Sequence, residues 1–434
     1  MSVLNLVSLA GIAVLSLVAW LAGGCRRPVP LRTVRGSLVL MIATGTLVFL
    51  VPQSRQLLVR LNDLVVAALG SANAGAEFLF GPLAVGPGRS TAAGESSIGF
   101  VLAAQVLPAV VFFTALMALF YFLGLVQPVV RVFGRLFHRS LGLSGAESLS
   151  GAANIFLGVE SVTTIRPYLD GLTRSELLTV LTCCMSTVAS TTLAIYVLFL
   201  DDVFPRIAGH LISASVISIP AAALVSKLML PETERPATRG HVPPLPRDDR
   251  AENPVAALTA GAWDGLRLAA GIATLLIAVL GIVGLVDLGL NRISQPFADR
   301  LGGVIDVGRI LGWVFTPLTL LLGVEPADVS QAGRLLGQRL VVTEVPTYRE
   351  LAELSAAGAI SPRTMLILSY ALCGFAHVAS VGIFVGGISA IAPTRRADLA
   401  ALAPRALLGA TLATLLTGAL AGLFYHGQGG VLAG

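Results

Sequence analysis

The chain has 434 residues, of which 12% are charged and 55% belong to the hydrophobic set, with 46 glycines in addition. Soluble globular proteins carry about 25% charged residues, so this composition excludes a set of soluble domains. The formal net charge is +5, but the arginines fall in short loops between apolar runs. That pattern indicates membrane topology and excludes a nucleic-acid-binding surface. We therefore predict an all-α polytopic membrane protein.

Eight apolar runs approach the length that a helix needs to cross a bilayer. Basic residues follow the first run and do not precede it, so we predict a retained span and not a cleaved signal peptide. With the N-terminus outside, the arginine-rich loops face the cytoplasm, as the positive-inside rule requires. Both termini then lie outside the plasma (inner) membrane. The predicted spans are residues 3–24, 38–51, 98–126, 176–200, 207–230, 268–290, 365–392 and 401–424.

Two further apolar segments, 141–173 and 328–362, are interrupted near the middle, at GVES (158–161) and TEVP (343–346). Each half is too short to cross the membrane, so we predict two re-entrant helical hairpins. Non-helical backbone at that depth is tolerated where protein buries it or where it lines a wet cavity. Each hairpin precedes two spans, and the loop count gives the two units opposite orientations. An inverted repeat with broken helices indicates a secondary transporter whose site lies between the repeats.

This repeat predicts how the chain is divided. Two transport repeats alternate with scaffold segments, and a Pro-rich, charged cytoplasmic linker separates them. The first repeat begins with an amphipathic interfacial helix at 130–140. The predicted divisions are N-terminal scaffold spans 1–126, first transport repeat 127–230, linker 231–260, scaffold span and connector 261–325, and second transport repeat 326–434.

Ionisable side chains at membrane depth are costly, at roughly 2.5–3.5 kcal/mol each on insertion scales. Glu160 and Glu344 occupy the two breaks, and His377 lies in a glycine-flanked part of the seventh span, with Ser380 one turn further on. These groups predict a site for a polar solute. The alternative is that they pair internally or cap half-helices. For Glu147, which precedes the first break, we favour internal pairing.

Asn154 precedes the first break by one turn, and Thr187 lies in the middle of the fourth span. Their side-chain oxygens, with carbonyls freed by broken helices, suit a hard cation such as Na⁺. The competing interpretation is that both side chains bond carbonyls of their own helices. The sequence contains no HExxH, GxSxG, Walker A or GxGxxG motif, so we predict that the protein is not an enzyme.

Several stretches of the chain resemble the concentrative nucleoside transporters, the cation–nucleoside symporter family. AES at 146–148 leads into AANIFLG at 152–158, PETE stands at 231–234, and SYALCGFA at 369–376 precedes GGI at 386–388. The resemblance implies import of a nucleoside-like solute by an elevator-type movement, driven by Na⁺ or H⁺. It also implies a homotrimer with scaffold and mobile transport domains, and no cofactor beyond the coupling ion.

The resemblance assigns site residues by position. Two positions depart from the family pattern: the first hairpin tip is shorter than the family's GQTEAP, and His377 stands where the family has Asn. The departures leave the substrate open, and H⁺ competes with Na⁺ because His377 can titrate. A membrane receptor that kept the fold and lost transport is the alternative function. The implied substrate-binding residues are Val159, Glu160, Ser161, Glu344, Phe375, His377 and Ser380. The implied Na⁺ ligands are Asn154, Thr187 and the carbonyls of Leu157 and Val188.

Overall fold

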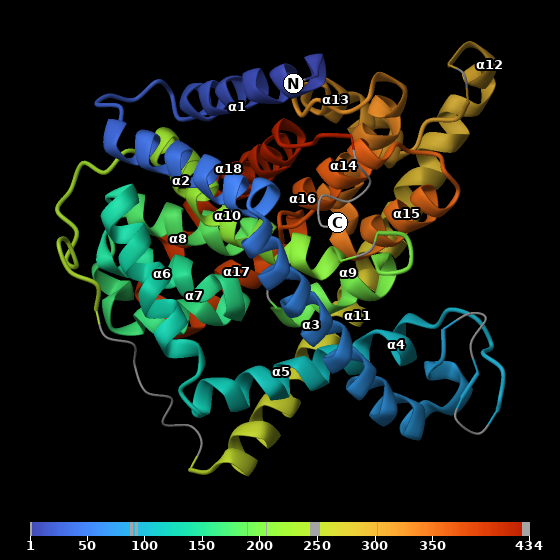
Figure 1. Cartoon of the computed structure of the whole chain (residues 1–434). Coiled ribbons are helices and arrows are strands. Elements are labelled where there is room, and N and C mark those ends of the chain that lie inside the picture. Colours follow the sequence, from blue (N-terminus) through green and yellow to red (C-terminus); the bar gives the residue numbers. More distant parts are fainter. Residues whose placement is uncertain are drawn as a thin grey trace.

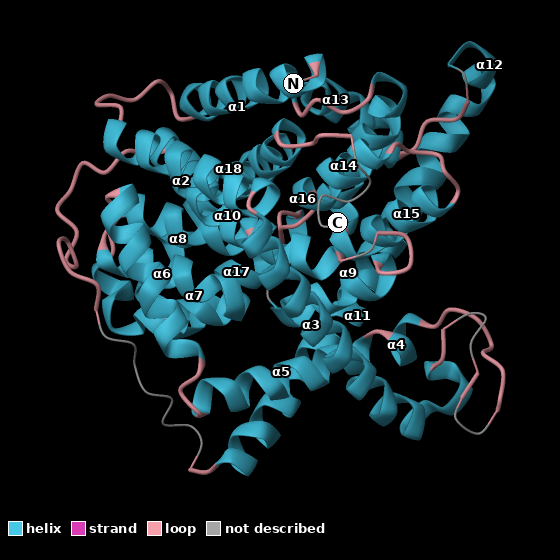
Figure 2. Cartoon of the chain, viewed as in Figure 1, coloured by secondary structure: helices cyan, strands magenta, loops and turns pink. Residues whose placement is uncertain are grey.

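The computed structural model describes residues 2–86, 90–91, 94–188, 190–204, 206–243, 252–301 and 303–427. Within these ranges the regular elements are helices and no strand occurs, as Figure 2 shows, which confirms the all-α prediction. Figure 1 labels the α-helices along the chain. The α-helices are α1 (Val3–Ala22), α2 (Leu31–Leu50), α3 (Pro52–Phe80), α4 (Leu102–Gln105), α5 (Leu107–Phe122), α6 (Val126–Leu141), α7 (Gly145–Leu157), α8 (Arg174–Ser186), α9 (Ser190–Leu200), α10 (Ile207–Met229), α11 (Pro254–Ser294), α12 (Ala298–Leu301), α13 (Val307–Leu321), α14 (Val329–Val342), α15 (Glu344–Ala356), α16 (Pro362–Ala371), α17 (Val378–Ile391) and α18 (Arg396–Leu423). The 3₁₀ helices are η1 (Gly81–Ala84), η2 (Gly158–Gly171), η3 (Gln295–Phe297), η4 (Pro326–Asp328) and η5 (Pro393–Arg395).

Seven helical stretches of the described residues are long and apolar enough to cross a membrane. Six of them coincide with predicted spans. The remaining stretch, Val59–Ala84, contains most of α3. The sequence analysis missed this helix because Arg60, Asn62 and Asp63 interrupt its apolar positions. The remaining two predicted spans, 176–200 and 365–392, are each divided into two shorter helices, α8 with α9 and α16 with α17. An interrupted span is what a transporter site uses to expose backbone groups.

Both predicted hairpins break where the sequence is interrupted. Helix α7 begins with a capping box between Ser144 and Glu147 and ends at Gly158, whose φ of 61° stops the helix. The returning arm is the 3₁₀ helix η2. In the second hairpin, α14 ends and α15 begins around Thr343, whose φ is +86°. A non-glycine residue with positive φ is uncommon and marks a constrained turn, so hairpin 2 turns sharply at the residue before Glu344.

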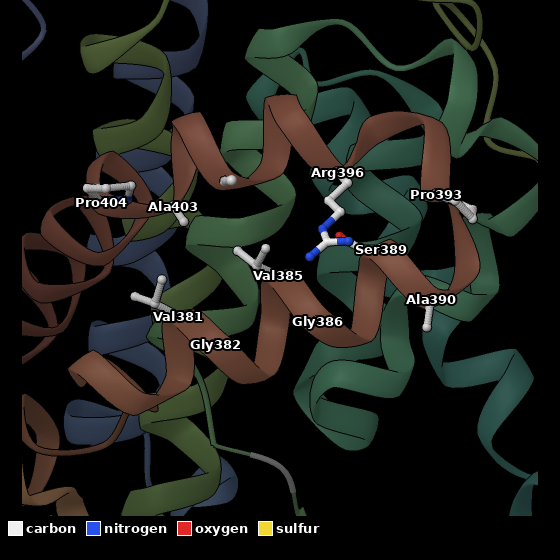
Figure 3. A pocket seen from close by; sticks show the side chains of 11 residues that line it. Val381, Gly382, Val385, Gly386, Ser389, Ala390, Pro393, Arg396, Ala403 and Pro404 are labelled. Atoms are coloured by element: carbon white, nitrogen blue, oxygen red, sulfur yellow. The ribbon is translucent and has the colours of Figure 1, made fainter.

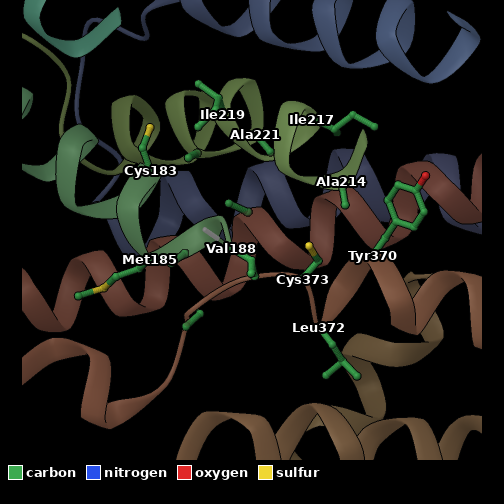
Figure 4. Close-up of a cluster of buried hydrophobic side chains, with 14 of the residues drawn as sticks. Cys183, Met185, Val188, Ala214, Ile217, Ile219, Ala221, Tyr370, Leu372 and Cys373 are labelled. Carbon is green, nitrogen blue, oxygen red and sulfur yellow. The ribbon is translucent and has the colours of Figure 1, made fainter. Parts of the chain in front are cut away.

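The two interrupted spans contact each other at their breaks. The backbone N–H of Phe375 donates to the carbonyl of Thr187 at 3.3 Å, and Figure 4 shows Val188 and Cys373 in one buried cluster between them. A Cβ at Gly374 would lie 2.5 Å from a methyl carbon of Thr414 and 2.9 Å from the carbonyl oxygen of Ser186. The close approach of the two breaks therefore requires glycine at this position.

Helices α10 and α18 are buried along most of their length, whereas α1, α2, α5 and α11 expose apolar faces. Helices α8, α10 and α16 pack on α18, and α5 packs along α11. A helix that exposes an apolar face in a membrane protein meets lipid or another chain. The breaks of the two spans thus lie in the interior, beside the most buried of the described helices.

Candidate functional site

Glu344 is the first residue of α15, and the turn at Thr343 directs it into the interior, where it is 1% exposed. Its Oε1 accepts a hydrogen bond from the hydroxyl of Tyr196 in α9 at 2.8 Å. Its Oε2 lies 3.3 Å from Nε2 of His377, which is fully buried. The carboxylate of hairpin 2 therefore faces residues from both interrupted spans.

His377 is the N-cap of α17, and its Nδ1 accepts a hydrogen bond from the backbone N–H of Ser380 at 3.1 Å. A backbone N–H only donates, so Nδ1 carries no proton and the neutral imidazole carries its proton on Nε2. The Nε2–H donor and the Oε2 acceptor of Glu344 consequently lie side by side. Neither has a hydrogen-bond partner within the described part of the chain. A group that both donates and accepts, such as a hydroxyl, complements this pair.

Arg339 of α14, five residues before Glu344 in the chain, is also fully buried. Its Nη1 donates to the carbonyl of Ala371 at 2.8 Å and to the hydroxyl of Thr414 at 2.9 Å. Ala371 ends α16, so the cation sits at a helix C-terminus, where the helix dipole favours positive charge. Nε and Nη2 of Arg339 have no partner among the described residues. The sequence analysis missed Arg339; an arginine five residues before the glutamate of a re-entrant break was the available signal.

Aromatic rings enclose this polar group. Tyr196 stacks on Tyr348 with ring centroids 4.2 Å apart, and the Tyr348 hydroxyl donates to the carbonyl of Ser369 at 2.7 Å. The ring of Phe375 lies 4.6 Å from that of His377, centroid to centroid. The sequence analysis included Phe375 and missed both tyrosines, since a tyrosine inside an apolar run is usually a packed core residue.

A second polar cluster lies at the break of α8 and α9. The Nδ2 of Asn154 donates to the carbonyl of Cys183 at 2.7 Å and to the hydroxyl of Thr187. The hydroxyl of Ser161 donates to Oδ1 of Asn154 at 3.2 Å. The side chains of Asn154, Thr187 and Ser161 are all buried. Ser161, which the resemblance assigned to the substrate, therefore lies with the residues expected to bind the cation.

The other implied residues are found at helix ends. Leu157 ends α7, and Val188 lies between α8 and α9, so the carbonyls of both stand where helical bonding stops. The backbone of Val159 and Glu160 belongs to η2, but their side chains lie outside the described part of the structure. Ser380 donates from its hydroxyl to the carbonyl of His377 at 2.6 Å, which reinforces the start of α17.

Glu147 forms an internal pair, as the sequence analysis favoured. Its Oε1 lies 2.6 Å from Nζ of Lys227, the one lysine of the chain, and its Oε2 accepts from the backbone of Ser144 at 2.8 Å. Both charged side chains are at most 5% exposed. This pair joins the start of α7 to the end of α10 and has no contact with the site around Glu344.

Family models for Na⁺-dependent nucleoside transporters match three parts of the chain. The N-terminal model matches residues 10–83, a nucleoside recognition (Gate) model matches 103–202, and the C-terminal model matches 210–422. A Haemophilus influenzae uncharacterized transporter is 35% identical over 98% of both chains. The Helicobacter pylori nucleoside permease NupC is 32% identical over 97% of this chain and 98% of its own length.

A mammalian relative and two solved structures are also similar. Sodium/nucleoside cotransporter 1 of Mus musculus is 33% identical over 98% of this chain and 64% of its own length. The structure of CNTnw in an inward-facing, substrate-bound state superposes with a TM-score of 0.86 at 35% identity, covering 97% of this chain and 98% of that one. A variant of CNTnw in an outward-facing state gives a TM-score of 0.86 at 34% identity over 98% of both chains.

Proposed function

The chain belongs to the family of Na⁺-dependent nucleoside transporters, and from this premise we propose that it imports a nucleoside-like solute by Na⁺-coupled symport. It is a multi-pass membrane transporter and not an enzyme. The solute class, the coupling ion and the direction are the parts that we propose. The observation that carries the solute class is the pair formed by Glu344 and His377 at the break of hairpin 2.

This pair supports a sugar-bearing solute. Oε2 of Glu344 and Nε2 of His377 are 3.3 Å apart. A ribose hydroxyl can donate to the first atom and accept from the N–H of the second. Hydrogen bonds to charged groups contribute roughly 1.5–3 kcal/mol each, so a carboxylate at this position contributes much of the affinity. We assign Ser380 and Phe375 to the same sugar-binding group. Val159 and Glu160, at the tip of hairpin 1, are proposed to contact the base.

The coupling ion is proposed to be Na⁺ and not H⁺. Asn154, Thr187 and Ser161 gather amide and hydroxyl oxygens, and the carbonyls of Leu157 and Val188 end helices beside them. Oxygen ligands of this kind suit a hard cation. His377 is poorly suited to carry the coupling proton, because a second proton on Nδ1 would remove the hydrogen bond that caps α17.

We further propose an elevator movement of a transport domain against a scaffold, in a homotrimer. The scaffold comprises residues 1–126 and 261–325, the transport domain comprises 127–230 and 326–434, and the linker is 231–260. The packing of α5 along α11 supports the scaffold pairing, and that of α8, α10 and α16 on α18 supports one transport unit, whereas α1 and α2 also pack on α18 and α10. A relative, CNTnw, captured in inward- and outward-facing states supports alternating access. The positive-inside rule supports termini that face the outside of the cell.

A receptor that binds nucleoside without transport is the second candidate, and the short hairpin 1 tip favours it. Purified protein in proteoliposomes separates the two. We expect concentrative uptake of radiolabelled uridine or adenosine that requires an inward Na⁺ gradient. Thermal stabilisation by a nucleoside with no flux in the same vesicles would favour the receptor. Flux that ignores Na⁺ and collapses with a protonophore would make the coupling ion H⁺.

A further inference from the structure

A groove runs between α17 and the first half of α18 (Figure 3). Its volume is about 660 Å³, within the roughly 300–1,000 Å³ typical of small-molecule sites. Its walls are mainly apolar, with Val381 and Val385 on α17 and Ala403 and Pro404 on α18. The groove begins one helical turn beyond His377 and is separate from both polar clusters described above.

Two glycines keep the groove open. Gly382 and Gly386 are exposed, and a Cβ at either position would meet nothing within 4 Å. The packing of the described chain therefore does not require glycine here, although glycine destabilises a helix interior relative to alanine. Small residues on a membrane helix allow a neighbouring molecule to approach the backbone closely. The space thus suits a ligand from outside the chain.

The polar groups of the groove gather at one end. Arg396 extends from the start of α18 towards Ser389 of α17 (Figure 3). The Ser389 hydroxyl is buried and has no hydrogen-bond partner in the described structure. Arg396 forms no ion pair with a described residue, whereas its neighbour Arg395 pairs with Asp398 at 3.2 Å. The groove therefore combines an apolar wall with an uncompensated guanidinium and a free hydroxyl.

We propose that this groove binds one anionic phospholipid, with an acyl chain along the valines and the phosphate at Arg396 and Ser389. A guanidinium is well suited to phosphate oxygens, and its uncompensated charge favours an anionic headgroup over a zwitterionic one. The positive-inside rule places the segment with Arg395, Arg396 and Arg405 at the cytoplasmic leaflet. Anionic lipids gather there, and basic pockets between membrane helices bind their headgroups.

Native mass spectrometry of the full, delipidated protein tests this proposal, with dioleoyl phosphatidylglycerol, dioleoyl phosphatidylcholine and glycerol 3-phosphate as probes. We expect one phosphatidylglycerol per chain, with weaker binding of phosphatidylcholine and none of glycerol 3-phosphate. Arg396→Gln should weaken phosphatidylglycerol binding about fivefold, and Gly386→Leu should abolish it by filling the groove. The matched controls are Arg405→Gln, an exposed charge on the same helix outside the groove, and Gly284→Leu on α11, where a Cβ also meets nothing within 4 Å.

Each of several results would overturn the proposal. Equal affinity for the two lipids, or equal losses in the Arg405→Gln and Arg396→Gln variants, would remove the role of the groove arginine. Binding of glycerol 3-phosphate as tight as that of the lipid would make the site one for a small anion. A lower oligomeric mass for Gly386→Leu would assign the groove to a second copy of the chain. If the Gly386→Leu variant took up solute more slowly but bound lipid as the wild type does, the groove would be assigned to the path of the solute.

Discussion

At the scale of single residues, the position of one proton decides what the site offers. The hydrogen bond from the backbone of Ser380 holds His377 as an acceptor on Nδ1 and a donor on Nε2. Glu344 then faces a donor and not a competing charge, with Tyr196 on its other oxygen. His377, which stands where the family has asparagine, thus still presents an N–H to the proposed solute position, because the helix cap fixes its tautomer.

Glu344→Gln should weaken nucleoside binding by about ten- to a hundredfold, the loss expected for hydrogen bonds to a charged group. The loss should exceed that caused by Glu160→Gln. The residues proposed to bind the sugar match the family pattern more closely than the hairpin 1 tip does. Isothermal titration with uridine and adenosine measures both. Glu353→Gln is the control, because this carboxylate is exposed and pairs with Arg349. An equal or reversed order of the two variants would refute the assignment.

Asn154→Ala should abolish Na⁺-dependent uptake. The substitution removes the amide that contacts Thr187 and Ser161, and with it an oxygen ligand of the proposed cation site. Initial uptake rates in proteoliposomes at a series of Na⁺ concentrations measure this effect. Wild-type-like sodium dependence in the variant would move the cation site elsewhere. Asn62→Ala in α3, whose side chain bonds the backbone of Ala208 instead, is the matched control.

At the scale of elements, the proposed function depends on two interrupted spans that contact each other at their breaks. Each break leaves helix ends whose backbone groups lack helical partners, and the contact between Phe375 and Thr187 satisfies one such pair. Arg339 occupies the C-terminus of α16 and fixes the second break from the side of hairpin 2. The clusters proposed to bind the solute and the cation are therefore joined by backbone, so we expect occupancy of one to constrain the geometry of the other.

Gly374→Ala should lower the free energy of unfolding by about 1–3 kcal/mol, the usual range for overpacking a well-packed interior. The added methyl group would press against Thr414 and the carbonyl of Ser186. A thermal-shift measurement in detergent reports the change. Gly386→Ala supplies the control, since it adds the same methyl group to the same interrupted span, where nothing lies within 4 Å. A Gly374→Ala variant as stable as this control would show that the breaks are not tightly packed.

At the scale of the whole molecule, some helices are buried in the protein core and others expose apolar surface to the surroundings. Helices α10 and α18 are covered by other helices, and α11 exposes most of its apolar surface. Lipid, a neighbouring copy of the chain, or both must cover that surface in the membrane. The proposed trimer would place part of it between protomers, and the proposed elevator requires that the transport domain slide past the rest.

The native cysteines test the orientation of the molecule. Cys25, in the loop after α1, is exposed, whereas Cys183, Cys184 and Cys373 are buried. With the N-terminus outside, a membrane-impermeant maleimide should label the protein only after the cells are permeabilised. Cys25→Ser should remove the labelling. Labelling in intact cells that the same substitution abolishes would place the first loop outside and invert the proposed topology.

The helices and breaks were largely predictable because their causes are local. Each apolar run extends over a short stretch of sequence. The helices of the two hairpins end at Gly158 and just before Glu344, where the sequence itself is interrupted. The analysis missed α3, where scattered polar residues hide a long helix, and it read the fourth span as continuous. The glycines around His377 did indicate that the seventh span is locally unwound, and α16 and α17 are separated there. The break of the fourth span depends on distant segments that bury and satisfy its freed backbone, which no window of sequence contains.

The sequence alone determined the membrane class, the two opposed hairpins and the identity of Glu344, His377, Asn154 and Thr187 as candidates, because ionisable and polar side chains are costly inside a bilayer. Only the tertiary structure decided how these groups are paired. Tyr196 and Glu344 are 148 residues apart in the chain, and the proton of the imidazole follows from a helix cap. Such contacts depend on packing between elements, which short-range patterns do not encode.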